Sequence, residues 1–280
     1  MPDLTSAGPF GPARQIETVP VEVVADMYRA KCAFDTRPHF GTITALKRFE
    51  CVTTGYRYWR PKEAAGDESF YRGLSAAWPD YYRDWRWEYG PVLSMLKPTD
   101  CILEIGSGRG FFLKHTEGLV KSAVGLDLNQ DAIEHKVTRN DILASTVEDF
   151  SASHRDTFDA VCSFQVLEHM TSPETFFQAA IACLKPGGSL FFSTPNALNA
   201  AFANREDAFD LPPHHMGQFS PAVYRRLAKL YGLRIRRVMQ ESRFVERGSS
   251  ITSSIKRLLN VAHRAIRGPG PTVLAVLRKP

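Results

Sequence analysis

Short apolar runs alternate with stretches of helical spacing in the middle of the chain. Five runs are apolar along their whole length, which predicts strands covered on both faces of a sheet: residues 101–106, 122–128, 141–146, 158–164 and 188–194. Helical spacing predicts helices between them at residues 111–117, 130–138 and 173–184. This alternation of strand and helix is typical of a doubly wound parallel sheet.

Two more strands are predicted after residue 195. Residues 233–240 alternate with period two and residues 272–279 form an apolar run, while a helix is expected from Ser220 or Pro221 to Leu230. The predicted fold class is therefore α/β, with a doubly wound, Rossmann-like, seven-stranded and mostly parallel sheet. Between the last two strands, an apolar stripe flanked by Lys and Arg predicts a basic amphipathic insertion at 249–268, which either packs on the sheet or lies at a membrane interface.

The residues before this pattern are different in kind. Residues 1–25, which begin rich in proline and glycine, are expected to be flexible, and residues 26–77 have short β-like runs that predict a small appendage. The main domain is then residues 78–280. Aromatic residues crowd between Trp78 and Tyr89, which predicts a helix covered on both sides, by the core or by a ligand.

Composition narrows the class of protein. With 44% hydrophobic and 23% charged residues among 280, the chain is typical of a soluble globular protein. It has no run of about 18 uncharged apolar residues, and its N-terminus lacks the pattern of a signal peptide. Its five cysteines are widely scattered, so a disulfide framework is not expected. We therefore expect a cytoplasmic protein without a transmembrane segment.

Charge is divided unevenly along the chain. Residues 221–280 carry a net charge of +12, whereas the first 220 residues carry −7. This asymmetry indicates either a solvated basic face or an anionic partner near the C-terminal part: a phosphate-bearing substrate, a membrane surface or a nucleic acid.

A glycine-rich turn follows the first predicted strand of the sheet. Glycines at positions 106, 108 and 110 let the backbone turn sharply and approach a ligand, and Asp127 ends the next strand, where a carboxylate can hold both hydroxyls of a ribose. A fingerprint for nicotinamide dinucleotides requires its third glycine where this chain has Phe111, and the Gly-Lys-Ser/Thr of a phosphate-binding loop is missing. Both of those nucleotide sites are therefore disfavoured.

The order of five segments resembles the class I S-adenosylmethionine-dependent methyltransferases: residues 102–110, 125–129, 158–170, 184–188 and 191–196. The chain is similar in particular to the branch that includes ubiquinone-biosynthesis O-methyltransferases and bacterial sugar and glycan methyltransferases. The segment 212–233, with its paired histidines before a helix, also resembles that branch.

The resemblance implies S-adenosyl-L-methionine as cofactor and a set of residues that bind it. Glu104 is expected to orient its methionine end, Asp127 to hold the ribose, and Gln165 to close over the methionine moiety. The remaining members form the floor of the site or border the adenine: Gly106, Ser107, Gly108, Gly110, Leu128, Thr146 and Val147.

Methyl transfer to a hydroxyl needs alignment of the acceptor oxygen with the methyl group, and a base. Histidine is suited to that task, and the candidates are His169 and, favoured over it, His214 or His215, each of which is otherwise a capping or surface residue. Ubiquinone-type relatives can hold a divalent metal with two acids and a histidine after the fourth strand. Here Gln165 replaces the first acid before Glu168 and His169, so we predict no metal.

Two cysteines resemble remnants of an N-terminal zinc ribbon found in some members of the branch. In Cys32-x-x-Asp35 and Cys51-x-x-Thr54, two of the four ligand places hold Asp and Thr, so we expect a degenerate ribbon without zinc, or a chance spacing.

The predicted function is O-methylation of a sugar, glycan or other small-molecule hydroxyl, with an acceptor that carries phosphate or lipid as one possibility and peripheral membrane contact as another. The rivals are a methyltransferase acting on nucleic acid or protein and a non-catalytic cofactor-binding partner. We do not expect a nucleic acid, because the Asn/Asp-Pro-Pro-aromatic run of base-methylating enzymes is replaced by SFQVLEH.

Overall fold

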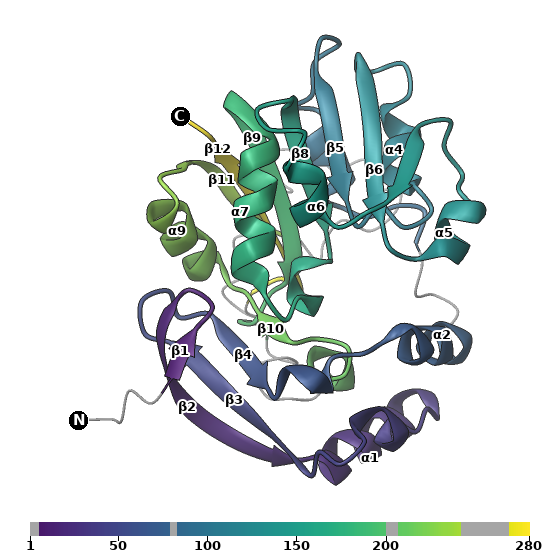
Figure 1. Cartoon of the computed structure of the whole chain (residues 1–280), viewed down its shortest axis with the longest axis vertical. Coiled ribbons are helices and arrows are strands. Elements are labelled where there is room, and N and C mark those ends of the chain that lie inside the picture. The colour runs from purple at the N-terminus through teal and green to yellow at the C-terminus, as the bar shows by residue number, and fades with distance from the viewer. Residues whose placement is uncertain (1–5, 79–82, 200–206, 242–268) are drawn as a thin grey trace, which may run out of the picture.

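Two β-sheets organise the chain, a large one and a small one (Figure 1). The computed structural model describes residues 6–78, 83–199, 207–241 and 269–280. The small sheet and two N-terminal helices lie beside one end of the large sheet (Figure 1).

The large sheet has seven strands in the order β11-β12-β9-β8-β5-β6-β7. Its members are β5 (Cys101–Ile105), β6 (Ser122–Asp127), β7 (Asp141–Ala144), β8 (Phe158–Phe164), β9 (Leu184–Pro195), β11 (Arg234–Gln240) and β12 (Thr272–Arg278). The pairs from β9 through β8, β5 and β6 to β7 are parallel, whereas β12 is antiparallel to both of its neighbours. This confirms the predicted fold class, and the order reverses between β5 and β8, where such sheets bind their ligands.

Helices cover both faces of the large sheet. They are α3 (Tyr89–Leu93), α4 (Phe111–Thr116), α5 (Gln130–Glu134), α6 (Val147–Ser151), α7 (Pro173–Cys183) and α9 (Pro221–Leu230). Successive side chains of a strand point to opposite faces. Thus Leu103 and Val161 belong to one core with α6, α7 and α9, while Ile102 and Ala160 belong to another with α3 and α4.

Several predicted bounds differ from the structure. The helix expected at 130–138 ends at Glu134, and the strand expected from 188 begins at Leu184. The helix expected between Trp78 and Tyr89 was wrong for residues 83–88, which form bends and turns before α3. Proline is tolerated in the first turn of a helix, so Pro91 is compatible with a helix that begins only at Tyr89.

The small sheet has the order β1-β2-β3-β4-β10 and is antiparallel. Its strands are β1 (Ser6–Gly8), β2 (Gly11–Pro20), β3 (Ala45–Cys51), β4 (Arg57–Arg60) and β10 (Gly217–Gln218), and α1 (Val21–Cys32) and α2 (Glu68–Ala77) pack beside it. The described part of the segment expected to be flexible, residues 6–25, forms β1, β2 and the start of α1. Here β2 pairs with β1 on one side and β3 on the other.

The two cysteines compared with a zinc ribbon, Cys32 and Cys51, lie in different parts of the N-terminal fold. Cys51 lies at the end of β3 that pairs with Ala13, and its Sγ donates a hydrogen bond to the Phe10 carbonyl at 3.4 Å. Cys32 ends α1, which starts where Pro20 leaves the opposite end of the same strand pair. The two cysteines pack on different cores, so their spacing does not form paired metal knuckles.

The small sheet shares its core with the main domain. β10 comes from the second half of the chain but pairs with β4, and Trp59 donates its backbone N–H to the Met216 carbonyl at 2.9 Å. Tyr56 packs against Phe219 with ring centroids 4.8 Å apart. The predicted boundary between residues 77 and 78 therefore runs through a continuous core.

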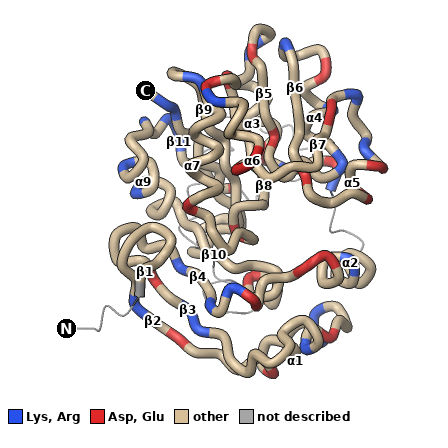
Figure 2. Tube along the Cα trace, viewed as in Figure 1, with Lys and Arg blue, Asp and Glu red and all other residues tan. Residues whose placement is uncertain are grey.

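Lys and Arg of the C-terminal part are visible on α9, β11 and the end of β12 (Figure 2). The predicted basic insertion at 249–268 lies outside the described residues. Within the described parts of the chain, no helix is long and apolar enough to cross a membrane.

Candidate active site

The glycine turn follows β5 at the point where the strand order reverses. Gly106, Gly108 and Gly110 adopt left-handed conformations, with φ of 71°, 53° and 77°. A Cβ on Gly106 would come within 2.3 Å of Val166 Cγ2, and one on Gly110 within 2.5 Å of Thr138 Cγ2. Glycine is therefore required at both positions by conformation and by space.

Asp127 connects the glycine turn to the next strand. Its Oδ2 accepts the backbone N–H of Gly108 at 2.6 Å, and its Oδ1 accepts that of Asn129 at 2.8 Å. Burial raises the pKa of this carboxyl, while the backbone N–H groups act in the opposite direction. The side chain predicted to hold a ribose thus also holds the turn in place.

Glu104 is a buried acid beside the turn. It is 3% exposed, and its Oε2 has no hydrogen-bond partner within the described residues. Burial and then the charge of Asp127 raise its pKa well above the usual range, and the positive charge of Arg86 offsets part of this. A buried carboxylate oxygen without a partner fits a ligand that brings a positive charge, as the ammonium and sulfonium of S-adenosylmethionine do.

The other predicted cofactor residues differ in whether their side chains are free or already engaged within the protein. Leu128 is 67% exposed at the end of β6, free to lie against a ring. Thr146 instead caps α6 by accepting the Asp149 N–H at 3.1 Å, Val147 is buried in the core, and the Ser107 hydroxyl faces the Leu126 carbonyl. Contacts from Thr146 and Val147 to a ligand would therefore come from the backbone.

Gln165 follows β8 and is held in a left-handed conformation with φ of 58°. Its Nε2 donates to Ser193 Oγ at 3.2 Å and to Glu88 Oε1 at 3.3 Å, and the Ser193 hydroxyl donates to the same Glu88 oxygen at 2.9 Å. Burial raises the pKa of Glu88. The amide predicted to close over the methionine moiety is thus fixed by two groups on other elements.

Arg86 and Glu88 are site residues that the sequence analysis missed. Burial raises the pKa values of Glu88, Glu104 and Glu168, and the positive charge of Arg86 offsets part of this rise in each, so the three acids lie within its electrostatic reach. The sequence did contain a signal for them, because Arg86 and Glu88 lie within a run of aromatic residues. Charged side chains are rarely buried in such surroundings unless they have partners.

Three histidines meet on the same side of the sheet. His169 ends the short 3-10 helix Leu167–His169 after β8, and His214 and His215 precede β10. The ring centroid of His169 lies 4.7 Å from that of His214 and 5.0 Å from that of His215. The centroids of His214 and His215 are 4.3 Å apart. The structure therefore brings all three predicted catalytic residues together.

Two buried carboxyl groups border the histidine cluster, which we define as His169, His214 and His215. Glu168 Oε1 lies 3.9 Å from His169 Nε2, and Asp210 Oδ1 lies 3.5 Å from His215 Nδ1. Burial raises the pKa of both carboxyls to about 8 and lowers that of His169 to about 4. At neutral pH this environment keeps the imidazole of His169 uncharged.

The histidine cluster is joined directly to the cofactor side. The segment that carries Glu168 and His169 begins at Val166, whose side chain fills the space next to Gly106. The Met216 N–H donates to the Glu168 carbonyl at 2.8 Å, which ties the second histidine-bearing loop to the first. Tyr71 of α2 covers the cluster, with its hydroxyl 3.0 Å from His169 Nδ1.

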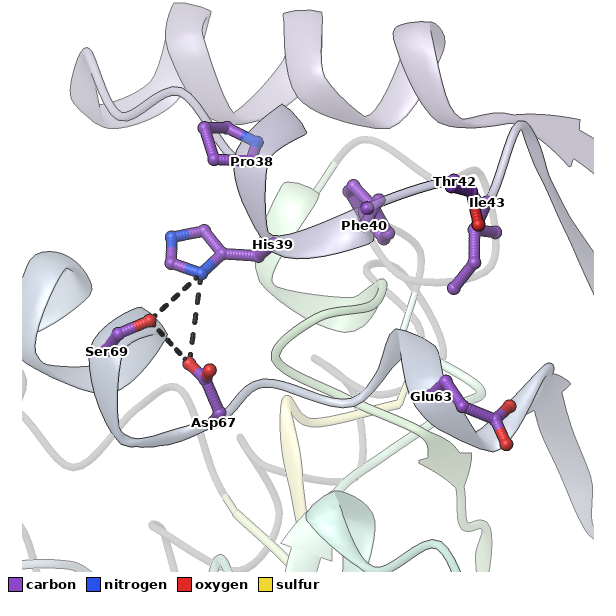
Figure 3. A pocket seen from close by; sticks show the side chains of 9 residues that line it. Pro38, His39, Phe40, Thr42, Ile43, Glu63, Asp67 and Ser69 are labelled. Atoms are coloured by element: carbon purple, nitrogen blue, oxygen red, sulfur yellow. Dashed lines mark hydrogen bonds and ion pairs between the residues drawn. The ribbon is translucent and has the colours of Figure 1, made fainter.

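A cavity of about 450 Å³ lies in the N-terminal part (Figure 3). It contains a Ser, a His and an Asp, but they are not arranged for nucleophilic catalysis. Ser69 donates to Asp67 at 2.7 Å, and the same His39 Nδ1 faces both of them (Figure 3). Asp67 accepts the Phe70 N–H and so caps α2. This group stabilises a helix end.

Comparison with known proteins identifies the family. Residues 77–238, more than half of the chain, match the family model described as "Methyltransferase domain". The chain belongs to this family, and its sheet and glycine turn are those of the class I S-adenosylmethionine-dependent methyltransferases. S-adenosyl-L-methionine is its cofactor.

Curated relatives cover only part of the chain. The ubiquinone biosynthesis O-methyltransferase of Xanthomonas axonopodis pv. citri is 35% identical over 128 residues, which are 42% of this chain and 52% of that protein. The protein of the same name from Thiobacillus denitrificans is 32% identical over 150 residues, 47% of this chain and 63% of that protein. The chain thus spans about half the length of the curated relatives it matches.

A solved structure shows the same fold. An S-adenosylmethionine-dependent methyltransferase from Archaeoglobus fulgidus superposes with a TM-score of 0.51 at 18% identity, over 68% of this chain and 90% of that one. The resemblance seen in the sequence is confirmed at the level of family, fold and cofactor.

Proposed function

We propose that the protein transfers the methyl group of S-adenosylmethionine to a hydroxyl oxygen of a small molecule, in particular a sugar or glycan. The observation that carries this proposal is the histidine cluster, whose member His169 lies on the segment that packs against the glycine turn. A group that can take up a proton is thereby next to the place where the methyl group is held. The name O-methyltransferase of the curated relatives supports oxygen as the acceptor atom.

The cofactor would be held along the ends of β5, β6 and β8. Gly106, Gly108 and Gly110 form the floor, and Asp127 binds the ribose with Leu128 on the adenine. Glu104 faces the positive end of the methionine moiety, whose carboxylate pairs with Arg86, and Gln165 closes over it. The bound cofactor supplies a methyl group on a positively charged sulfur, ready for in-line displacement.

The proton of the acceptor hydroxyl would go to the histidine cluster. His169 Nδ1 faces the His214 carbonyl at 2.7 Å, and a carbonyl can only accept, so in the neutral ring Nδ1 carries the proton and Nε2 is the nitrogen that would take up another. Glu168, whose Oε1 lies 3.9 Å from Nε2, would in its ionised form stabilise the imidazole that has taken up the proton. His169 is therefore the member of the cluster that we assign as base.

The acceptor would lie between the large sheet and the N-terminal part. Tyr71 reaches the histidine cluster from α2, and its hydroxyl donates to the His214 carbonyl at 3.3 Å. Acceptors that carry phosphate or a lipid, and a cytoplasmic location, remain predictions from the sequence.

The test is a product assay with S-adenosylmethionine and a panel of nucleotide-linked and lipid-linked sugars, read by mass spectrometry. Replacing His169 by Ala is expected to lower kcat by a factor of about 10²–10⁴, as for loss of a general base, with cofactor affinity unchanged. His39→Ala, in the cavity of the N-terminal part, is the matched control and is expected to keep full activity. Cofactor binding without turnover on any hydroxyl acceptor would instead support a non-catalytic binding protein.

A further inference from the structure

The histidine cluster has the hydrogen-bond pattern of a metal site. His214 Nδ1 lies 3.0 Å from the Phe209 carbonyl, and His169 Nδ1 lies 2.7 Å from the His214 carbonyl. His215 Nδ1 faces the carboxylate of Asp210 at 3.5 Å. The carbonyls that face His169 and His214 can only accept, so in these two neutral rings Nδ1 carries the proton and Nε2 the lone pair. Asp210 favours the same tautomer of His215 when its carboxyl is ionised. Histidines that bind metal ions almost always donate their other ring nitrogen to a carbonyl or a carboxylate in this way.

The distances are close to those of a single ion. One ring nitrogen from each of the three histidines lies within 4.8 Å of the other two. Zinc–nitrogen bonds of about 2.0–2.1 Å in a tetrahedral site place ligand nitrogens about 3.3 Å apart. Binding of one ion would therefore bring the ring nitrogens closer to one another by up to about 1.5 Å.

A second observation points to a cation at the same place. Glu168 is 1% exposed, and within the described residues neither of its carboxylate oxygens has a hydrogen-bond partner. Its nearest polar neighbour in the cluster is His169 Nε2, at 3.9 Å from Oε1. A buried carboxylate is costly unless it is paired with a charge or coordinates a metal. An ion held by the three rings would supply that charge.

We propose that His169, His214 and His215 bind one divalent transition-metal ion of the zinc class, with an open position that faces the acceptor and Glu168 beside it. Imidazole ligands select zinc, iron, cobalt, nickel or copper rather than magnesium or calcium. Three protein ligands with one open position are typical of catalytic rather than structural zinc.

The proposed site has different ligands from the acidic run that the sequence analysis considered. The place of the first acid in that run is Gln165, and its amide is bound to Glu88 and Ser193 instead. The prediction of no metal was made from that run alone. His214 and His215, which lie 45 and 46 residues beyond His169, complete a site that only the folded chain brings together.

The proposal rests on the proposed function in one respect only. When bound, such an ion lowers the pKa of a hydroxyl that it contacts, so that a strong base is not needed. Its proton would then go to Glu168 rather than to His169. Metal binding itself requires no acceptor and can be tested without one.

The test uses the full-length protein, purified without a polyhistidine tag and stripped with a chelator. Cobalt(II) is titrated into it, and the visible absorption of a four-coordinate cobalt ion is recorded, with zinc as competitor and magnesium as control. One equivalent is expected to bind and to be displaced by zinc but not by magnesium.

Variants assign the ligands. His169→Ala and His215→Gln are expected to weaken cobalt binding by at least about 100-fold, and Asp210→Asn, which keeps the fold of the loop but holds His215 less firmly, by about 10–100-fold. His39→Ala is expected to bind cobalt as the wild-type protein does. Titration with S-adenosylmethionine checks that each variant is folded.

Two results separate this proposal from the proposed function. No cobalt absorption, or equal binding in His169→Ala, His215→Gln and wild type, would overturn the metal site and leave methyl transfer with a histidine base intact. Stoichiometric cobalt binding with no methylation of any hydroxyl would support the metal site and contradict the proposed function.

Discussion

Asp127 combines two tasks at the scale of a single residue. Its carboxylate already accepts two backbone N–H groups, from Gly108 and Asn129, and still has lone pairs for the ribose hydroxyls that we propose it binds. Replacing it by Ala is expected to weaken S-adenosylmethionine binding by about 10–100-fold, because charge-assisted hydrogen bonds contribute about 1.5–3 kcal/mol each. Asp127→Asn keeps one acceptor for the turn, so its affinity for S-adenosylmethionine is expected to lie between those of the wild-type protein and Asp127→Ala. Calorimetric titration measures all three.

The matched control for this prediction is Asp131→Ala. Asp131 is an exposed acid on α5, four residues further along, and its side chain faces only His135 at the surface. The affinity of the Asp131→Ala protein for the cofactor is expected to equal that of the wild-type protein. Unchanged affinity in Asp127→Ala would contradict the ribose assignment.

Glu104 predicts how cofactor affinity depends on pH. Its folded pKa is raised above the ordinary 4.5, mainly by burial, so the carboxyl is neutral below the raised value and charged above it. Only the charged form attracts the positive end of the cofactor. Affinity is therefore expected to rise with pH up to the raised pKa and then to level off, with release of a proton on binding below it.

Calorimetry in buffers of different ionisation enthalpy measures this proton release. Glu104→Gln removes the titrating group, so its affinity is expected to be weaker and without this pH dependence. A rise that persists in Glu104→Gln would assign the titration to another group.

The sequence allowed individual site residues to be predicted where they belong to a local motif. It did not allow this where residues distant in the sequence meet only in the fold. The glycine turn and Asp127 were found because they lie within 22 residues and follow predicted strands. The three histidines were named one by one, but their meeting depends on the hydrogen bond from Met216 to Glu168, which no local pattern contains. Arg86 and Glu88 lie outside every motif and are recognised only by what surrounds them.

At the scale of elements, β10 is the shortest strand of the described residues and leaves little room for a side chain at Gly217. A Cβ on Gly217 would lie 2.1 Å from Tyr56 Oη and 2.9 Å from its Cζ. The Tyr56 ring cannot move away, because it is fully buried and packs on Phe10, Tyr58 and Phe219. Gly217→Ala is expected to cost about 1–3 kcal/mol of unfolding free energy, as overpacking does.

Chemical denaturation checks this value, and Gly90→Ala is the control. Gly90 lies in α3, where a Cβ would meet nothing closer than 3.8 Å, so alanine there is expected to be neutral or to stabilise by up to about 1 kcal/mol. Equal stability of Gly217→Ala and wild type would show that β10 can shift.

Elements were predictable in proportion to their length and burial. The strands of the large sheet are nearly continuous apolar runs, and six of the seven were placed within two residues of their observed bounds. The two-residue β10 and the five-residue α6 are too short to show a period. β2 is long, but only Ala13 and Val19 are buried along it, so its sequence does not alternate.

At the scale of the whole molecule, the two sheets are expected to unfold together. Phe10, Tyr56 and Tyr58 of the small sheet belong to the same core as Leu103, Phe177 and Tyr224 of the main domain. Calorimetry is therefore expected to show one transition with equal calorimetric and van't Hoff enthalpies. A fragment of residues 78–280 leaves β10 without its partner strand and exposes Phe219, so it is expected to aggregate. Two separate transitions, or a well-folded fragment, would contradict this.

The pairing of β10 with β4 has a consequence for how the protein could diversify. The loop that carries His214 and His215 ends in a strand whose neighbours come from the first 60 residues, whereas the glycine turn and Asp127 depend on residues 101–144. Substitutions in the N-terminal sheet would therefore reshape the proposed acceptor side while leaving the strands that carry the glycine turn and Asp127 unchanged. Across species, we expect acceptor choice to vary with residues 6–77 while recognition of the methyl donor stays constant.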